Sequence, residues 1–407
     1  MVNAMCKLIR WVCLTLAVLS CRPALFETPP RSARPYGSGG TAQRPVEEPE
    51  PPAEPVINLY ASAYCFPDSV DWRAGAPSSG SLLLLKNGAE LLRLPTEGKL
   101  EPDRHRIVKG KLWTDRCENG QMIVSCNGQE RFRFAGEEVF NGFWVDDDRV
   151  YTLGQRPGGG VTFRVNGQER FSSGNGLLLN GPEEANWEGG AFCVDTGGIY
   201  YAYGVPIRKQ NQVTWEYRVM NGERTEKTVP LGEGCQMYDI RVWNGTVYRV
   251  ENRYGALYMV KGENNLFVSL QSGEAPHYCK LVPAGDRMLL KGYSYRPAFT
   301  YWFREPDDLV LAVTGKPVVS ELVMDGEHHG YLQENAAGNI LGVYWDQDLV
   351  FRSDGRHTLT TSRCVQLKKQ TFGVALTAAT GRRHMLIRQT DTLTIRFNGY
   401  FTSVQID

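Results

Sequence analysis

The chain has 407 residues, of which 42% are hydrophobic and 22% charged, a balance typical of a globular protein with a large core. Lys plus Arg and Asp plus Glu are equal at 45 each. Because no net charge attracts polyanions over long range, a nucleic-acid role has no electrostatic support. The 43 glycines and the 11% of aromatic residues favour turns and pleated strands, so the composition indicates an all-β protein.

Residues 1–21 have the features of an export signal. Lys7 and Arg10 form a positive start, and the apolar run from Trp11 to Leu19 is too short to span a bilayer stably. The run ends in Val18-Leu19-Ser20-Cys21, which resembles the lipobox of bacterial lipoproteins. That resemblance implies that Cys21 is lipidated and anchors the protein in a membrane. The alternative is an ordinary cleaved signal that happens to contain a cysteine.

Residues 22–55 are rich in Pro, Glu, Arg, Ser and Gly, and such a segment cannot bury enough apolar surface to fold. We expect a disordered tether that holds a folded domain, residues 56–407, away from its anchor. The residue after Cys21 is not Asp, which by resemblance to the enterobacterial sorting rule argues against retention in the inner membrane. The acidic cluster that resembles the export signal of surface lipoproteins is also missing. By this resemblance, the expected location is the periplasmic face of the outer membrane.

The folded part consists of repeats. A strand, an Asn-Gly turn and a second strand recur, and Asn-Gly between strand-like residues is a strong hairpin signal because both turn positions need positive φ. The four clear copies are Leu82 to Leu94, Met122 to Phe134, Val161 to Ser173 and Trp215 to Val229. A second series of polar turns precedes them, as in Val145 to Tyr151, Val194 to Tyr200 and Val242 to Tyr248, with weaker copies at Gly285 and Gly338.

Together the two series give four strands per unit. Weaker outer hairpins near Lys261-Gly262, Glu305-Pro306, Asp354-Gly355 and Gln389 to Asp391 complete a count of eight units at about 43 residues each. This pattern predicts a β-propeller of seven or eight four-stranded blades, eight by the repeat count. The C-terminal Phe401 to Ile406 alternates like a strand and could pair with Val56 to Tyr64 to close the ring. An open solenoid of hairpins is the alternative.

The lipobox, the Pro-rich tether and the repeats, taken together, resemble the propeller-type lipoproteins of Bacteroidota. The resemblance covers most of the mature chain and implies fold and export rather than an activity. The Gly-His and Trp-Asp pairs of tryptophan-aspartate repeats are not found at the repeat spacing, so that family's scaffolding partners are not implied.

No catalytic motif, metal site or cofactor site emerges. His328 and His329 have no identifiable third ligand, and Asp146-Asp147-Asp148 occupies a repeated turn where Asp is favoured by turn chemistry alone. There is no Gly-x-Ser-x-Gly elbow, and the nearest fragment of a sialidase Asp-box, Ser353 to Gly355, lacks the Trp. A glycosidase would need two carboxylates at a defined separation, which one sequence cannot reveal.

Two further features are candidate sites. Cys117 and Cys126 flank a short turn on what look like adjacent strands, and they are the predicted disulfide of an exported chain with seven cysteines after Cys21, an odd number that leaves at least one unpaired. Aromatic residues either bind sugars or pack between blades. Those in loops at the channel mouth, such as Tyr293, Tyr295 and Arg296, are the predicted ligand face.

These observations predict a lipid-anchored binding or scaffold propeller without catalysis. Its partner would be a protein or glycan of the cell envelope. A glycan-active hydrolase or lyase on the same scaffold is the alternative.

Overall fold

This computed structural model describes residues 57–74, 79–97, 105–135, 139–146, 149–179, 192–195, 198–209, 212–268, 279–294, 300–314 and 318–407. Pro55–Asp407 forms one compact unit, separate from Met1–Glu54. Cys21, Tyr295 and Arg296 lie outside the described residues. Within the described ranges, no helix has the length and apolar character needed to cross a membrane.

Nearly every described element is a strand in an antiparallel sheet, which confirms the all-β prediction. The first three sheets in chain order are β33-β1-β2-β3, β4 to β7 and β8 to β11. Their strands are β33 (Gly399–Ile406), β1 (Leu59–Cys65), β2 (Ser79–Lys86), β3 (Ala89–Glu97), β4 (His105–Val108), β5 (Lys111–Glu118), β6 (Gln121–Cys126), β7 (Gln129–Ala135), β8 (Val139–Asp146), β9 (Arg149–Gln155), β10 (Val161–Val165) and β11 (Gln168–Ser172).

Three more sheets follow in the middle of the chain. Their strands are β12 (Leu177–Leu178), β13 (Cys193–Asp195), β14 (Gly198–Lys209), β15 (Gln212–Asn221) and β16 (Arg224–Leu231); β17 (Cys235–Trp243), β18 (Thr246–Arg253), β19 (Ala256–Lys261) and β20 (Asn264–Phe267); and β21 (Lys280–Ala284), β22 (Arg287–Ser294), β23 (Thr300–Arg304) and β24 (Leu309–Thr314).

The last sheet has eight strands and consists of two four-stranded meanders joined by residue pairs between β28 and β30. The strands are β25 (Val318–Asp325), β26 (His328–Glu334), β27 (Asn339–Trp345), β28 (Asp348–Thr358), β29 (Val365–Lys368), β30 (Thr371–Ala378), β31 (Arg383–Arg388) and β32 (Asp391–Arg396), with a 3-10 turn η4 (Ser362–Cys364) between the meanders. Counting this sheet as one blade or two gives seven or eight blades.

The predicted Asn-Gly hairpins are present. Asn87 and Gly88, for example, turn between β2 and β3 with φ of 49° and 84°, which an Asn-Gly pair tolerates better than other residues. The Asn87 side chain also accepts a hydrogen bond from the Leu59 backbone N–H at 2.9 Å, so the turn holds the neighbouring strand β1. Turn chemistry therefore sets both the hairpin and its attachment to the next strand.

The C-terminal strand closes the first sheet, as predicted. β33 pairs antiparallel with β1 from Leu59↔Ile406 to Cys65↔Gly399, with a bulge at Thr402. Strands from the two ends of the domain thus form one sheet, and β1 has no exposed edge.

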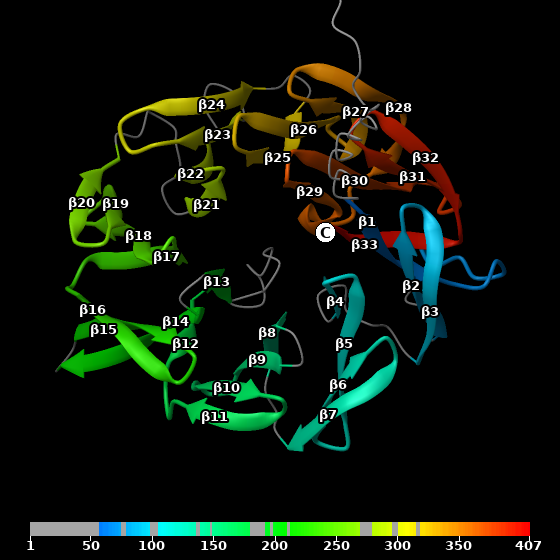
Figure 1. Cartoon of the computed structure of the whole chain (residues 1–407). Helices are drawn as coiled ribbons and strands as arrows, with labels where there is room; N and C mark the ends of the chain where they lie inside the picture. The colour runs from blue at the N-terminus through cyan, green and yellow to red at the C-terminus, as the bar shows by residue number, and fades with distance from the viewer. Residues whose placement is uncertain are drawn as a thin grey trace, which may run out of the picture. The chain divides into compact units, whose positions relative to one another are not determined.

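The core lies between the sheets, which follow one another around a ring (Figure 1). One apolar cluster joins β18 and β19 to β21–β23 through Val250, Leu257 and Leu290, and similar clusters join the other neighbours. A further cluster joins the two ends of the ring by packing Phe401 of β33 against Leu386 of β31. Burial of apolar surface at each junction, including this last one, stabilises a closed propeller.

The predicted disulfide between Cys117 and Cys126 is wrong. β5 and β6 are neighbours, but Cys117 pairs with Met122, and Cys126 pairs with Trp113. Four residues along a strand correspond to about 13 Å, whereas a disulfide needs Cα atoms within about 7 Å. Cys126 is a buried free thiol, and burial raises its pKa.

Candidate functional site

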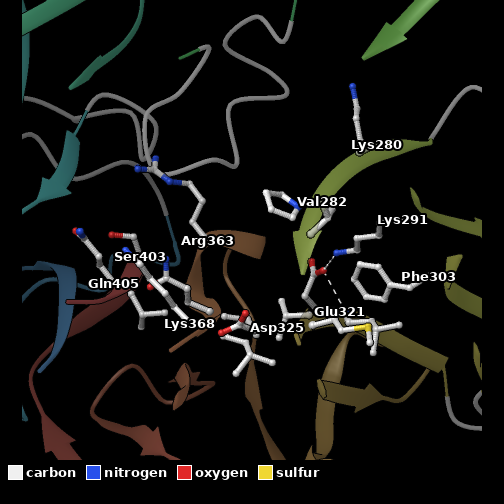
Figure 2. A pocket seen from close by; sticks show the side chains of 18 of the residues that line it. Lys280, Val282, Lys291, Phe303, Glu321, Asp325, Arg363, Lys368, Ser403 and Gln405 are labelled. Atoms are coloured by element: carbon white, nitrogen blue, oxygen red, sulfur yellow. Dashed lines mark hydrogen bonds and ion pairs between the residues drawn. The ribbon is translucent and has the colours of Figure 1, made fainter. Parts of the chain in front are cut away.

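A cavity of about 870 Å³ lies where the innermost strands of the sheets converge. β4, β8, β13, β17, β21, β25, β29 and β33 all contribute lining residues, so the cavity is the central channel of the propeller. Figure 2 shows side chains from β21, β25, β29 and β33 pointing into it.

The repeat fixes which side chains line the channel. Arg241 is two residues from the end of β17, and Trp144, Val323 and Gln366 occupy the same register position on β8, β25 and β29. Gln405 stands at the equivalent position of β33, opposite Tyr60 in β1, just as Arg241 stands opposite Tyr248 in β18. Because strand side chains alternate between faces, one register position per sheet supplies one ring of channel residues.

The described channel lining is strongly basic, although the whole chain carries no net charge. It contains six basic residues and two acidic ones: Arg106, Arg241, Lys280, Lys291, Arg363 and Lys368, against Glu321 and Asp325. A concave site with one excess sign of charge focuses the field and attracts ligands of the opposite sign. The charge of the described lining therefore favours an anionic ligand.

Carboxylates at and beside the channel are engaged in holding the scaffold. Glu321 of β25 forms an ion pair with Lys291 of β22 and accepts a hydrogen bond from the Leu322 N–H at 3.2 Å. The buried Asp239 of β17 accepts from the Ile240 and Leu281 N–H groups, both at 2.8 Å, and so ties β17 to β21. These acids join neighbouring strands, which accounts for their burial without a catalytic role.

One sector of the channel combines two arginine side chains with neighbouring polar side chains. Arg363 of η4 donates to the His105 carbonyl oxygen at 2.8 Å, which brings its guanidinium to β4, where Arg106 is the next residue. Arg363, Ser403 and Gln405 lie on the same side of the pocket in Figure 2. The sector therefore gathers residues separated by almost 300 positions in the chain.

Beneath this sector lies a buried network of hydroxyl groups and one imidazole. Ser62 Oγ lies 3.0 Å from His105 Nε2 and 2.5 Å from Ser403 Oγ, and Thr402 Oγ1 lies 2.8 Å from both Ser62 Oγ and His105 Nε2. Burial, together with the nearby Arg363 and Arg106, lowers the pKa of His105 well below its usual value. His105 is therefore neutral and acts as a hydrogen-bonding partner under the channel wall.

Aromatic side chains complete the lining. Tyr293 and Tyr301 meet edge to face with ring centroids 6.0 Å apart, and Lys291 Nζ lies 5.5 Å from the Tyr301 ring centroid. Trp144 lines the channel from β8. Rings of this kind present faces on which a sugar can stack.

The structure places one residue of the predicted ligand face, Tyr293, in the channel lining. The cationic groups, Ser403 and Gln405 were missed because no local motif joins them. A usable signal exists in the repeat: Trp144 and Arg241 stand just before the polar turns of the second series, so aligning those turns would have found the ring of channel residues.

The remaining candidates have structural partners. His328 Nδ1 lies 2.8 Å from Asp346 Oδ2, and its ring stacks on Trp345, so the His pair fastens a β-turn. Asp146 pairs with Lys109 at 3.5 Å on the surface, while Asp147 and Asp148 lie outside the described residues. Among the residues whose placement is described, no three His, Cys, Asp or Glu side chains form a group suited to a metal ion.

No protein-family model and no curated protein sequence matches this chain. Solved structures do match. Apo AztD from Citrobacter koseri has 8% identity and a TM-score of 0.45, over 87% of this chain and 98% of its own. A eukaryotic initiation factor has 11% identity and a TM-score of 0.47, over 86% and 99%. The β-propeller domain of the Trilobed protease from Pyrococcus furiosus has 11% identity and a TM-score of 0.39, over 66% and 85%. At these levels the similarities carry no argument about function.

Proposed function

We propose that this protein is a non-catalytic binding propeller of the cell envelope that recognises a glycan in its central channel. A lipid on Cys21 holds it at the periplasmic face of the outer membrane, and residues 22–55 serve as the tether. The lipobox-like sequence and the composition of the tether support the anchoring, and the channel supports the binding role.

One observation carries the binding proposal: six basic side chains and several aromatic rings converge on a single recessed cavity. Ligand sites are typically concave and largely apolar, with a few polar groups that orient the ligand. A recessed channel suits an oligosaccharide better than a folded protein, because protein partners usually bind through broad surfaces of about 800 Å² per side. We therefore favour the glycan over the protein partner.

The arrangement of the carboxylates argues against the alternative, a glycan-cleaving enzyme. Glycosidases generally place two carboxyl groups about 5–9.5 Å apart across the scissile bond. The two acids of the described lining, Glu321 and Asp325, both lie on β25, so they stand on one side of the channel rather than on opposite sides of a bound sugar. Glu321 is also engaged with Lys291.

Two adjacent lysines provide a matched test. Lys368 lines the channel, whereas Lys369 is an exposed residue of the following turn. The purified protein is titrated with oligosaccharides released from the cell envelope, and every bound species is then analysed for cleavage. We expect saturable binding of intact oligosaccharides, weakened at least about tenfold by Lys368→Glu and unchanged by Lys369→Glu. Equal effects of the two substitutions, or new reducing ends, would refute the proposal.

A further inference from the structure

The channel cavity extends sideways at one place, past the innermost strand of a sheet. Lys291 and Tyr293 of β22 and Tyr301 and Phe303 of β23 line it together with Glu321 of the neighbouring β25. Among the described residues, no other sheet contributes lining from its second or third strand. We call the space bounded by these five side chains the lateral recess.

Strand pairing explains why four of these side chains form one wall. Lys291 pairs with Phe303 and Tyr293 pairs with Tyr301, so the four project from adjacent positions of two neighbouring strands. Trp302, between the two residues of β23, is buried in the cluster shared with β18 and β19. Because side chains alternate along a strand, Tyr301 and Phe303 project to the opposite side, toward β25.

An ion pair joins this wall to β25. Lys291 Nζ contacts Glu321 Oε1, which also accepts the Leu322 N–H, whereas Oε2 takes part in neither bond. Figure 2 shows the pair at the cavity wall beside Phe303. The Lys291 side chain is 25% exposed and that of Glu321 10%. An ammonium has three donors and a carboxylate two acceptor oxygens, so the pair can both donate to a ligand and accept from it.

The aromatic rings of the recess stand beside this pair. Tyr293 and Tyr301 are only partly buried, and Lys291 Nζ lies 5.5 Å from the Tyr301 ring centroid. A pyranose sugar has an apolar face that packs on an aromatic ring and neighbouring hydroxyls that each donate and accept hydrogen bonds. The recess therefore combines the two kinds of contact that a sugar ring can make.

We propose that the lateral recess is a subsite for one uncharged pyranose residue of the glycan. One hydroxyl donates to Glu321 Oε2, the neighbouring hydroxyl accepts from Lys291 Nζ, and the apolar face of the sugar packs against Tyr293. This inference rests on the proposed glycan-binding function and names the residue class that this part of the channel takes.

The charges of the recess favour an uncharged sugar although the channel lining as a whole is basic. Lys291 and Glu321 together carry no net charge. A carboxylate or phosphate placed between them would face the like charge of Glu321, and an ammonium group would face Lys291. A hydroxyl pair meets neither penalty, because each hydroxyl can act as donor or acceptor.

The test titrates the purified protein calorimetrically with mannotriose, galactotriose and cellotriose, and with the permethylated form of each. We expect at least one of the three trisaccharides to bind saturably. Its permethylated form should bind at least about tenfold more weakly, because a methyl ether accepts hydrogen bonds but has none to donate to Glu321.

Variants then locate the site. Glu321→Gln should weaken binding of that trisaccharide about tenfold and reduce its advantage over the permethylated form, an effect that a purely structural role would not produce. Glu305→Gln is the matched control, because Glu305 pairs with Arg287 in the same sheet at 3.4 Å and is 44% exposed. It should bind as the unaltered protein does. Tyr293→Leu should weaken binding at least about threefold.

The melting temperature of each variant shows whether it has folded. If Glu321→Gln does not fold, Tyr293→Leu and the permethylated sugars on the unaltered protein still decide. Failure of all three trisaccharides, equal binding of the permethylated forms, or equal effects of Glu321→Gln and Glu305→Gln would overturn the inference.

A parallel titration with oligosaccharides released from the cell envelope separates this inference from the proposed function. If those oligosaccharides bind intact and Glu321→Gln binds them as tightly as the unaltered protein, the lateral recess is not a sugar subsite and the proposed function stands. If neither they nor the trisaccharides bind, the proposed function fails as well.

Discussion

At the residue scale, a few buried polar groups determine how the propeller responds to acid. His384 is fully buried between its neighbours; its Nδ1 accepts from the Ala378 N–H at 3.2 Å, and its Nε2 lies 3.0 Å from the Phe397 carbonyl oxygen. This geometry fits only the neutral imidazole, because a proton on Nδ1 would face another N–H. Burial lowers the pKa of His384 to about 4.

A pH dependence of stability follows. Between pH 6.5 and 4, the unfolded chain binds a proton at His384 and the folded chain does not, so stability falls as the pH falls through this window and levels off below it. His384 alone should cost about 3 kcal/mol over the window. The free energy of unfolding in urea is measured at several pH values for the protein and for His384→Gln. The contribution of His384 is the difference between the two plots of this free energy against pH. Parallel profiles would contradict it.

The hydroxyl network under the channel gives a second prediction at this scale. Thr402→Val removes the hydroxyl that Ser62 and His105 share and leaves them buried with one partner fewer. We expect a loss of about 1–3 kcal/mol in the free energy of unfolding. Thr392→Val, on the exposed face of β32, is the control and should change stability by less than about 0.5 kcal/mol. A loss no greater than that of the control would show that the network does not stabilise the fold.

At the element scale, the sequence predicted the hairpins whose turns contain Asn-Gly. The predicted turns were wrong where a glycine lies elsewhere in the hairpin. Asn127-Gly128 and Asn166-Gly167 turn as expected. Gly355, in contrast, lies inside β28, and the β27–β28 turn is formed by Asp346 and Gln347, which carry no Asn-Gly signal. Gly338 ends the turn between β26 and β27, whereas the turn between the innermost strand β25 and β26 contains Gly326.

The candidate site was less predictable than the fold for a physical reason. Turns are encoded by neighbouring residues, whereas the channel is formed by single residues from strands far apart in the chain. Tyr293 was found through the aromatic content of its segment, but Arg363 and Gln405 line the same cavity only because β33 closes the first sheet beside β29 and β4. The sequence predicted that closure without indicating which side chains it would bring together.

The pairing of β33 with β1 can be tested at Gly399, the first residue of β33, which pairs with Cys65. Gly399 has φ of 157°, and a Cβ atom there would lie 1.7 Å from the Tyr64 carbonyl oxygen. Gly399→Ala must therefore displace β33 from β1, and we expect a loss of roughly 1–3 kcal/mol or more, seen as a lower Tm. Gly232→Ala is the control, because nothing lies within 4 Å of its added Cβ. Equal Tm values for the two variants would contradict the closure geometry.

At the scale of the whole molecule, the anchor gives a separate prediction. If Cys21 carries the lipid, Cys21→Ser should abolish incorporation of a labelled fatty acid and move the protein from the membrane to the soluble fraction. Cys13→Ser, within the apolar run of the leader, should leave both unchanged. Labelling that persists in Cys21→Ser would mean that another residue carries the lipid.

The central claim is that the glycan binds in the channel and that the protein does not cleave it. Two tyrosines allow a direct measurement: Tyr293 lines the channel, and Tyr254 lies 82% exposed in the turn between β18 and β19. Each is replaced in turn by p-benzoylphenylalanine, and the protein is irradiated with oligosaccharides released from the cell envelope. We predict that sugar is crosslinked at position 293 and not at position 254, and that the unbound oligosaccharides keep their length. Crosslinking at position 254 alone, or shortened oligosaccharides, would contradict this account.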